Sequence, residues 1–421
     1  MGRDALRAVT SADVAALLPG GGGAGTRVFT AVCVAPGGDR FYLGDDDGDI
    51  IACRVVRGTD ADGVMTASVR VDAVANIADD DILNHAPFED SDDEDSCAGS
   101  CAQLSPRVMR LEYMASLNCV VAMTPRRGLT VHHLGLIDPH GRAPIERMRS
   151  GRISGTSGAV AFALDASKTH PTCVAVSRAG RKKPVKNIQF FDIIGETDEW
   201  ESNPRRTGRI KPRAVAVPAV ESGLTPTRLG IAHPAMRLAW HGAEHTLHVG
   251  TDRWFCAVNT KTGAARDVVP LVNHPGYEEG LGLTHVEMLP IVEEDGTRVT
   301  VCVTGHAGAV LSPEGTPAGK ALQFCGSSSG PRGPVRYALA FAGPYLVAVD
   351  VDGVNPAAVF DRAKPGGEPW EGEPVQFIDT FAGGTEADRA EQSAIAVRFS
   401  FHFVWAVSMT DVVFDSYRFR G

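Results

Sequence analysis

The amino-acid sequence predicts an all-β protein, a β-propeller of seven four-stranded blades with a disordered acidic insert. Short apolar runs alternate with Gly, Pro and Asp turns along the 421 residues. Paired runs recur seven times, centred near positions 46, 125, 182, 252, 306, 353 and 409. The intervals are about 45 to 80 residues, and repetition at roughly 40 to 50 residues is typical of propellers. We attribute the longer intervals to insertions.

Each pair of runs is interpreted as a hairpin because two apolar stretches flank a turn. The paired runs are 40–44 with 50–55, 117–122 with 129–134, 173–176 with 188–193, 247–250 with 255–258, 299–303 with 309–311, 345–349 with 357–360, and 402–407 with 412–414. A single small sheet cannot bury both of its faces, so we expect the sheets to pack around a common axis. Two unrelated β-sandwich domains are the alternative architecture.

The predicted boundaries follow composition. Residues 1–25 are expected to be a flexible N-terminal segment that ends in the Gly-rich run 20–25. The propeller is expected over 26–415, interrupted at 78–106 by an acidic, Ser-containing insertion that we predict to be disordered. Only the first 18 residues and 385–393 are compatible with helix.

The net charge of -10 is concentrated in one segment. Nine acidic residues lie between Asp79 and Asp95 with no Lys or Arg among them, so the rest of the chain is close to neutral. Nucleic-acid binding requires a basic footprint and is not expected.

A cytoplasmic location is predicted. No apolar run approaches the roughly 18 residues needed to span a bilayer, and the N-terminus does not resemble a signal peptide. The nine cysteines are expected to be reduced, mostly buried thiols. Cys97 and Cys101 form a C-x3-C pair without a second pair or a His pair, so zinc is not predicted.

Motifs for catalysis and cofactor binding do not emerge from the sequence. The run 20–25 lacks the Lys and Ser/Thr of a P-loop, and the turn Asp45–Asp49 has Ile50 where an EF-hand needs Gly. We interpret that turn as charged and solvent-facing. His132 and His133 are neighbours on a predicted strand and therefore point to opposite faces. We predict no catalytic, metal or cofactor site. The alternative is a propeller enzyme whose ligands gather at the axis.

Two basic segments and one serine are the candidate functional residues. The basic residues are predicted to lie in the same blade and to bind anionic lipid or an acidic partner; they are Arg178, Arg181, Lys182, Lys183, Lys186, Arg205, Arg206, Arg209, Lys211 and Arg213. Ser91, followed by acidic residues, suits an acidophilic kinase. Ordinary solvated loops are the alternative interpretation of both.

Several phrases, in order, resemble the citron homology (CNH) domain of the vacuolar sorting tether family. They are Arg237-Leu238-Ala239-Trp240, Leu247-His248-Val249-Gly250-Thr251, Phe255-Cys256-Ala257-Val258, 309–315, 343–349, 374–378 and 401–405. This family includes the HOPS and CORVET subunits and the TGF-beta receptor-associated protein. The similarity extends from about residue 26 to 407.

The resemblance implies a non-enzymatic interaction propeller in endosome-to-vacuole trafficking, peripheral on endosome or vacuole membranes. It implies protein partners among Rab-type GTPases, tether subunits and fusion machinery. A generic scaffold outside trafficking remains the alternative. In the family a helical solenoid follows the propeller, whereas this sequence stops at Gly421, so we expect either a truncated gene model or a stand-alone propeller.

Overall fold

The computed structural model of the chain is built from small, mainly antiparallel β-sheets. It describes residues 6–13, 29–35, 39–59, 61, 65–77, 106–124, 128–133, 146–147, 149–153, 156, 158–179, 184–193, 212–214, 229–230, 235–251, 254–270, 287–292, 298–304, 307–312, 317–323, 337–342, 345–350, 357–361, 374–378, 394–400, 403–408 and 413–419. Within these residues the strands form seven sheets, which we name A to G. The predicted acidic insertion and Ser91 lie outside the described residues, except for Pro106.

The first sheets along the chain follow one pattern, in which neighbouring strands are mostly consecutive in sequence. Sheet B contains β2 (Phe29–Val34), β3 (Arg40–Asp45), β4 (Asp49–Thr59), β5 (Met65–Asn76) and β9 (Glu146–Arg147). Sheet C contains β6 (Arg110–Met114), β7 (Cys119–Thr124), β8 (Gly128–His133) and β10 (Arg149–Arg152). Sheet D contains β11 (Ala159–Leu164), β12 (Cys173–Ala179), β13 (Pro184–Ile193), β14 (Pro212–Ala214) and β15 (Leu229–Gly230).

The remaining sheets continue that pattern, and the last includes the first strand. Sheet E contains β16 (Ala235–His241), β17 (Thr246–Thr251), β18 (Trp254–Asn259) and β19 (Ala265–Pro270), with the 3-10 turn η3 (Gly242–Glu244) between β16 and β17. Sheet F contains β20 (Glu287–Val292), β21 (Arg298–Thr304), β22 (Ala307–Leu311) and β23 (Pro317–Gln323). Sheet G contains β24 (Tyr337–Ala342), β25 (Tyr345–Asp350), β26 (Ala357–Asp361) and β27 (Gln376–Ile378). Sheet A contains β28 (Ala394–Ser400), β29 (Phe403–Ser408), β30 (Val413–Phe419) and β1 (Leu6–Asp13).

The seven predicted hairpins are confirmed as antiparallel strand pairs. They are β3 with β4, β7 with β8, β12 with β13, β17 with β18, β21 with β22, β25 with β26, and β29 with β30. Each sheet thus has one predicted hairpin at its centre. The flanking strands were not located from the sequence, although β2 (Phe29–Val34) and β24 (Tyr337–Ala342) are as apolar as the hairpin strands.

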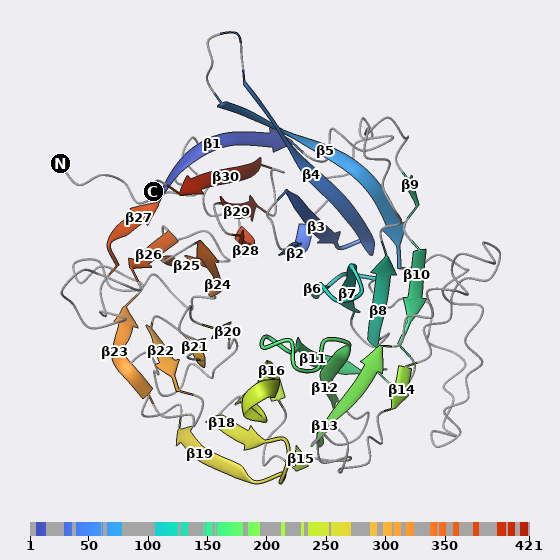
Figure 1. Cartoon of the computed structure of the whole chain (residues 1–421), viewed down its shortest axis with the longest axis vertical. Coiled ribbons are helices and arrows are strands. Elements are labelled where there is room, and N and C mark those ends of the chain that lie inside the picture. Colours follow the sequence, from blue (N-terminus) through green and yellow to red (C-terminus); the bar gives the residue numbers. More distant parts are fainter. Residues whose placement is uncertain are drawn as a thin grey trace.

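One strand of each sheet lies innermost in the view of Figure 1, around a common centre; in sheets B to G it is the first strand in sequence, and in sheet A it is β28. These strands are β2, β6, β11, β16, β20, β24 and β28. They contact one another in that order, and β28 also contacts β2.

Among the described residues no helix is long and apolar enough to cross a bilayer.

The core lies between the sheets, and strand β7 shows why the sequence favours this packing. All six residues of β7 are buried. Val120 and Ala122 pack toward sheet B, whereas Cys119, Val121 and Met123 pack toward sheet D. Alternate side chains of a strand point to opposite faces, so a run of consecutive apolar residues demands an apolar neighbour on each side.

Apolar packing between neighbouring sheets recurs at the junctions of sheet D with E and of sheet F with G. Ala161 and Ala163 of sheet D meet Trp240 and Leu247 of sheet E. In sheet F, Val301 and Val310 pack against Leu346 and Phe360 of sheet G. Burying each large side chain contributes about 1.5–3 kcal/mol, so these junctions supply much of the stability of the fold.

The prediction of a flexible N-terminal segment over 1–25 is wrong for Leu6–Asp13. These residues form β1 and pair antiparallel with β30, from Leu6 opposite Phe419 to Asp13 opposite Val413. Sheet A therefore combines segments from both ends of the sequence, and β30 extends past the predicted boundary at 415. Sequence reasoning missed β1 because its pairing partner lies about 400 residues away.

The turn at Asp45–Asp49 is charged, but it faces solvent only in part: Asp47 is exposed and Asp46 half-buried, whereas Asp45 and Asp49 are buried. The Asp45 side chain is buried, and its Oδ1 accepts hydrogen bonds from the N–H groups of Asp47 (3.1 Å) and Asp49 (2.7 Å). Gly48 occupies the left-handed region at φ 86°. A carboxylate that accepts backbone N–H groups replaces the water that the turn would otherwise need, which explains its burial.

Replacing a core side chain between sheets should test the packing between sheets. Leu247 is fully buried between sheets D and E, so Leu247→Ala is expected to lower the free energy of unfolding by about 2–5 kcal/mol. Val56 is 45% exposed, and Val56→Ala is expected to change the free energy of unfolding by less than about 0.5 kcal/mol. Chemical denaturation measures both, and similar effects from the two variants would contradict this account.

Candidate functional site

Three of the predicted basic residues lie in one sheet. Arg178 is on β12, Lys186 on β13 and Arg213 on β14, and these strands are neighbours in sheet D. The other members of the predicted set lie outside the described residues; they are Arg181, Lys182, Lys183, Arg205, Arg206, Arg209 and Lys211.

The register separates these basic positions along the sheet. Arg178 and Lys186 lie near the turn between β12 and β13, where Ala179 is opposite Pro184. Arg213 is opposite Asp192, near the other end of β13. Six residues of strand separate Lys186 from Asp192, or about 20 Å. The described basic positions therefore occupy two ends of sheet D and not one compact cluster.

A dense group of polar contacts lies where sheet D meets sheet E. Asp165 follows β11, and its Oδ1 accepts hydrogen bonds from the N–H groups of Ser167 (2.8 Å) and Gly242 (2.9 Å). Its Oδ2 accepts the N–H of His170 at 2.8 Å. One buried carboxylate thus organises its own loop and holds the turn after β16 in the next sheet. Hydrogen bonds to a charged acceptor are the stronger kind.

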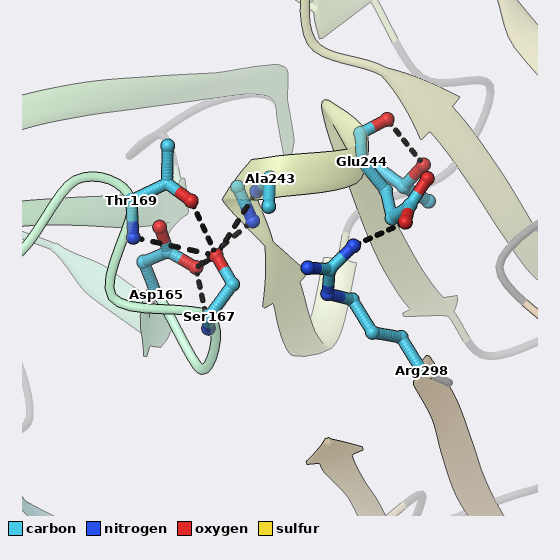
Figure 2. Close-up of polar contacts among 8 residues, drawn as sticks. Asp165, Ser167, Thr169, Ala243, Glu244 and Arg298 are labelled. Carbon is cyan, nitrogen blue, oxygen red and sulfur yellow. Dashed lines mark hydrogen bonds and ion pairs between the residues drawn. The ribbon is translucent and has the colours of Figure 1, made fainter. Parts of the chain in front are cut away.

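Ser167 adds a second link across the same junction (Figure 2). Its hydroxyl donates to Asp165 Oδ1 at 2.5 Å and accepts the N–H of Ala243 at 3.0 Å. Gly242 is required beside it, because a Cβ there would lie 2.2 Å from Asp165 Oδ2. The serine and aspartate therefore serve backbone groups, and sequence reasoning missed them because their partners come from another sheet.

Aromatic contacts pack beside these hydrogen bonds. The Trp240 ring is fully buried and stacks on His170, with ring centroids 5.5 Å apart and planes 7° apart. Phe190 of β13 meets the same indole at 5.2 Å. The sequence phrase that ends in Trp240 thus forms part of the contact between sheets D and E.

Two buried histidines connect sheet E to sheet F. His241 Nε2 lies 3.0 Å from the Thr300 hydroxyl, and His248 Nδ1 also makes a hydrogen bond with that hydroxyl. Burial, and then the neighbouring His248, lowers the pKa of His241 to about 3. A third histidine, His132 of sheet C, is also buried, and burial lowers its pKa to about 3. The His132 Nε2 atom lies 2.8 Å from the Thr130 hydroxyl. The imidazoles of His241 and His132 are therefore neutral at physiological pH.

The ion pair between Arg298 and Glu244 joins sheets E and F near the surface (Figure 2). Arg298 begins β21, and Glu244 belongs to η3. Glu244 is partly exposed, so solvent weakens this pair relative to the buried contacts of Asp165.

Among the described residues, five cysteines are free thiols. Cys33, Cys53, Cys119 and Cys173 are buried, and Cys256 is partly buried. Burial raises the pKa of Cys119 to about 12 and that of Cys256 to about 11. The thiolate is the reactive form, so these side chains act as small apolar groups. Among the described residues no group of three or more His, Cys, Asp or Glu side chains could hold a metal ion.

Neither the protein-family models nor the curated proteins contain a match to this chain.

Removing the Asp165 carboxylate should weaken the junction of sheets D and E. Asp165→Ala leaves three N–H groups without their acceptor, so it is expected to lower the free energy of unfolding by about 3 kcal/mol or more. Thr169 is exposed and its hydroxyl bonds Ser167 in the same loop, so Thr169→Ala should cost less than about 0.5 kcal/mol. Urea denaturation compares them. A loss below about 1 kcal/mol for Asp165→Ala would contradict the assigned role.

Acid should destabilise the protein through its buried histidines. An unfolded histidine binds a proton near pH 6.5, whereas His132 and His241 bind one only near pH 3. Between these values the unfolded state holds more protons, so stability falls as pH falls, by about 1.4 kcal/mol per pH unit for each histidine. Urea denaturation at several values from pH 4 to 7 gives the free energy of unfolding as a function of pH. Its slope against pH should be smaller for His241→Gln than for the unchanged protein. An equal slope would contradict the assignment.

Proposed function

We propose that the chain is a seven-bladed β-propeller in which each sheet is one blade. The proposal is supported by the seven small sheets, by the contacts between successive innermost strands, and by the contact of β28 with β2. The antiparallel pairing of β1 with β30 adds a fourth strand to sheet A. Radial packing would cover both faces of every sheet and leave only short outer edges.

We further propose that this propeller is a non-enzymatic platform for protein interactions. The observation that carries this proposal is the use of the polar groups between sheets. Asp165, Ser167 and Thr300 bind backbone groups or buried imidazoles of a neighbouring sheet, so these polar groups serve to join sheets. A rigid ring of joined sheets is suited to presenting loops and outer strands to partners.

The narrower proposal is a CNH-type subunit of a HOPS- or CORVET-like vesicle tether. It rests on the ordered phrases that resemble that family. Three of them fall on the consecutive strands β16, β17 and β18 of sheet E, and the last overlaps β29. Partners would then be a Rab-type GTPase, other tether subunits and fusion machinery, on endosome or vacuole membranes.

The binding surface in this proposal is the basic end of sheet D, where β12 is joined to β13. Arg178 and Lys186 lie at this end, and the sequence adds Arg181, Lys182 and Lys183 to the connecting segment. Clustered cations attract anionic lipid by about 1 kcal/mol each and orient charged partners before contact. A membrane that contains phosphoinositide, or an acidic protein surface, would bind these basic residues electrostatically.

Charge reversal should separate lipid binding from an inert loop. Replacing Lys182, Lys183 and Lys186 with Glu is expected to abolish flotation with liposomes that contain phosphoinositide. The matched control replaces Arg107, Lys168 and Lys261, which are exposed and lie outside the basic segments, with Glu and should still float. Equal flotation of both variants would reject lipid binding by this segment.

Purified GTPases should distinguish a tether subunit from a scaffold outside trafficking. The protein is immobilised and exposed to endosomal Rab-type GTPases loaded with a non-hydrolysable GTP analogue or with GDP. Retention that depends on the GTP form is expected. Retention of neither form, together with no capture of purified tether subunits, would reject the trafficking role while leaving the propeller proposal intact.

A further inference from the structure

Three arginines form a row across sheet B. Arg40 on β3 is directly opposite Arg54 on β4, and Arg54 is directly opposite Arg70 on β5. Side chains at directly opposite positions of an antiparallel pair lie on the same face, with Cβ atoms about 5 Å apart. Like charges in such positions are destabilising, so negative charge nearby would stabilise the row.

The protein supplies part of that charge. Asp72 Oδ2 lies 2.8 Å from Arg54 Nε, Asp72 Oδ1 lies 3.7 Å from Arg70 Nε, and the Asp72 side chain is 6% exposed. Asp39 precedes Arg40 and is exposed to solvent, which weakens its contribution. The buried carboxylate of Asp72 therefore serves the Arg54 and Arg70 part of the row, and Arg40 lies at the far end from it.

Three hydrogen-bond donors in and beside this row have no acceptor within the described part of the chain. The atoms are Arg40 Nε, Arg54 Nη2 and the Tyr42 hydroxyl, and all three are buried. Tyr42 is two residues after Arg40 on β3 and therefore shares its face. The Tyr42 ring stacks on Tyr113 of sheet C at 5.9 Å, which places the row beside the junction of sheets B and C. Buried donors without an acceptor are costly, so a ligand that supplies acceptor oxygens would be favoured here.

We propose that Arg40, Arg54 and Tyr42 form a binding site for a phosphate group. A phosphate ester carries a charge of about −1.5 to −2 and several acceptor oxygens, which matches the two guanidinium groups and the three unused donors. Guanidinium groups fit phosphate geometry well. A carboxylate ligand fits less well, because it has fewer acceptor oxygens and Asp72 already occupies the Nε side of Arg54. This site is in sheet B and is separate from the basic residues of sheet D.

Titration of the full chain with inorganic phosphate tests the site. Calorimetry is carried out in chloride buffer at constant ionic strength. The unchanged protein is expected to bind one phosphate, Arg40→Gln to bind it at least about tenfold more weakly, and Tyr42→Phe about threefold more weakly. Arg107→Gln removes the same charge from an exposed position before β6 and should bind like the unchanged protein.

Two further arms make the result decisive. Arg40→Lys keeps the charge but loses the planar fork, so intermediate affinity is expected, and it carries the test with Tyr42→Phe if Arg40→Gln does not fold. Glycerol 3-phosphate replaces inorganic phosphate in the second arm: tighter binding of the ester assigns the site to a phosphorylated molecule, and tighter binding of the inorganic ion assigns it to free phosphate. No phosphate binding by the unchanged protein, or binding by the Arg40 and Tyr42 variants equal to that of the unchanged protein, would overturn the proposal.

Discussion

Central strands that are apolar on both faces govern the rest of this structure. A strand such as β7, with all six residues buried, has no face that can be left to water. Its sheet must therefore lie between two others. The neighbouring sheets also bury apolar side chains at their junctions, such as Phe162 and Leu247. Strands this short could not be stable as separate hairpins. The fold therefore depends on interfaces between sheets more than on the strength of any one sheet.

Polar contacts fix how neighbouring sheets are placed, because apolar packing alone is not directional. Asp165 accepts N–H groups from its own loop and from Gly242 of the next sheet, and Thr300 meets two imidazoles from sheet E. These groups are buried, so a shift of one sheet against the other would leave several of them unsatisfied. Specific placement of sheets D, E and F thus comes from a few hydrogen bonds, while the free energy of folding comes mainly from the apolar surface around them.

The central hairpins could be predicted from sequence, whereas the interfaces could not. Two apolar runs around a turn are a local signal, and all seven such pairs form hairpins. Strand β1 gives no local signal, since its partner β30 is distant and its residues permit helix as well. The basic segments were visible as composition, but the register that places Arg178 and Arg213 at different ends of sheet D was not. The row of Arg40, Arg54 and Arg70 could not be predicted from the sequence for the same reason, because only strand pairing brings these residues together.

The pairing of β1 with β30 also dictates an order of events during synthesis. Of the described strands β1 leaves the ribosome first, and its hydrogen-bonding partner is made about 400 residues later. Until then β1 offers an open strand edge to any neighbour, and such edges are prone to wrong pairing. Sheets B to G are synthesised before that point, so they can assemble while β1 waits for β28, β29 and β30. Leu6–Asp13 can therefore pair with β30 only after every other described strand has been synthesised.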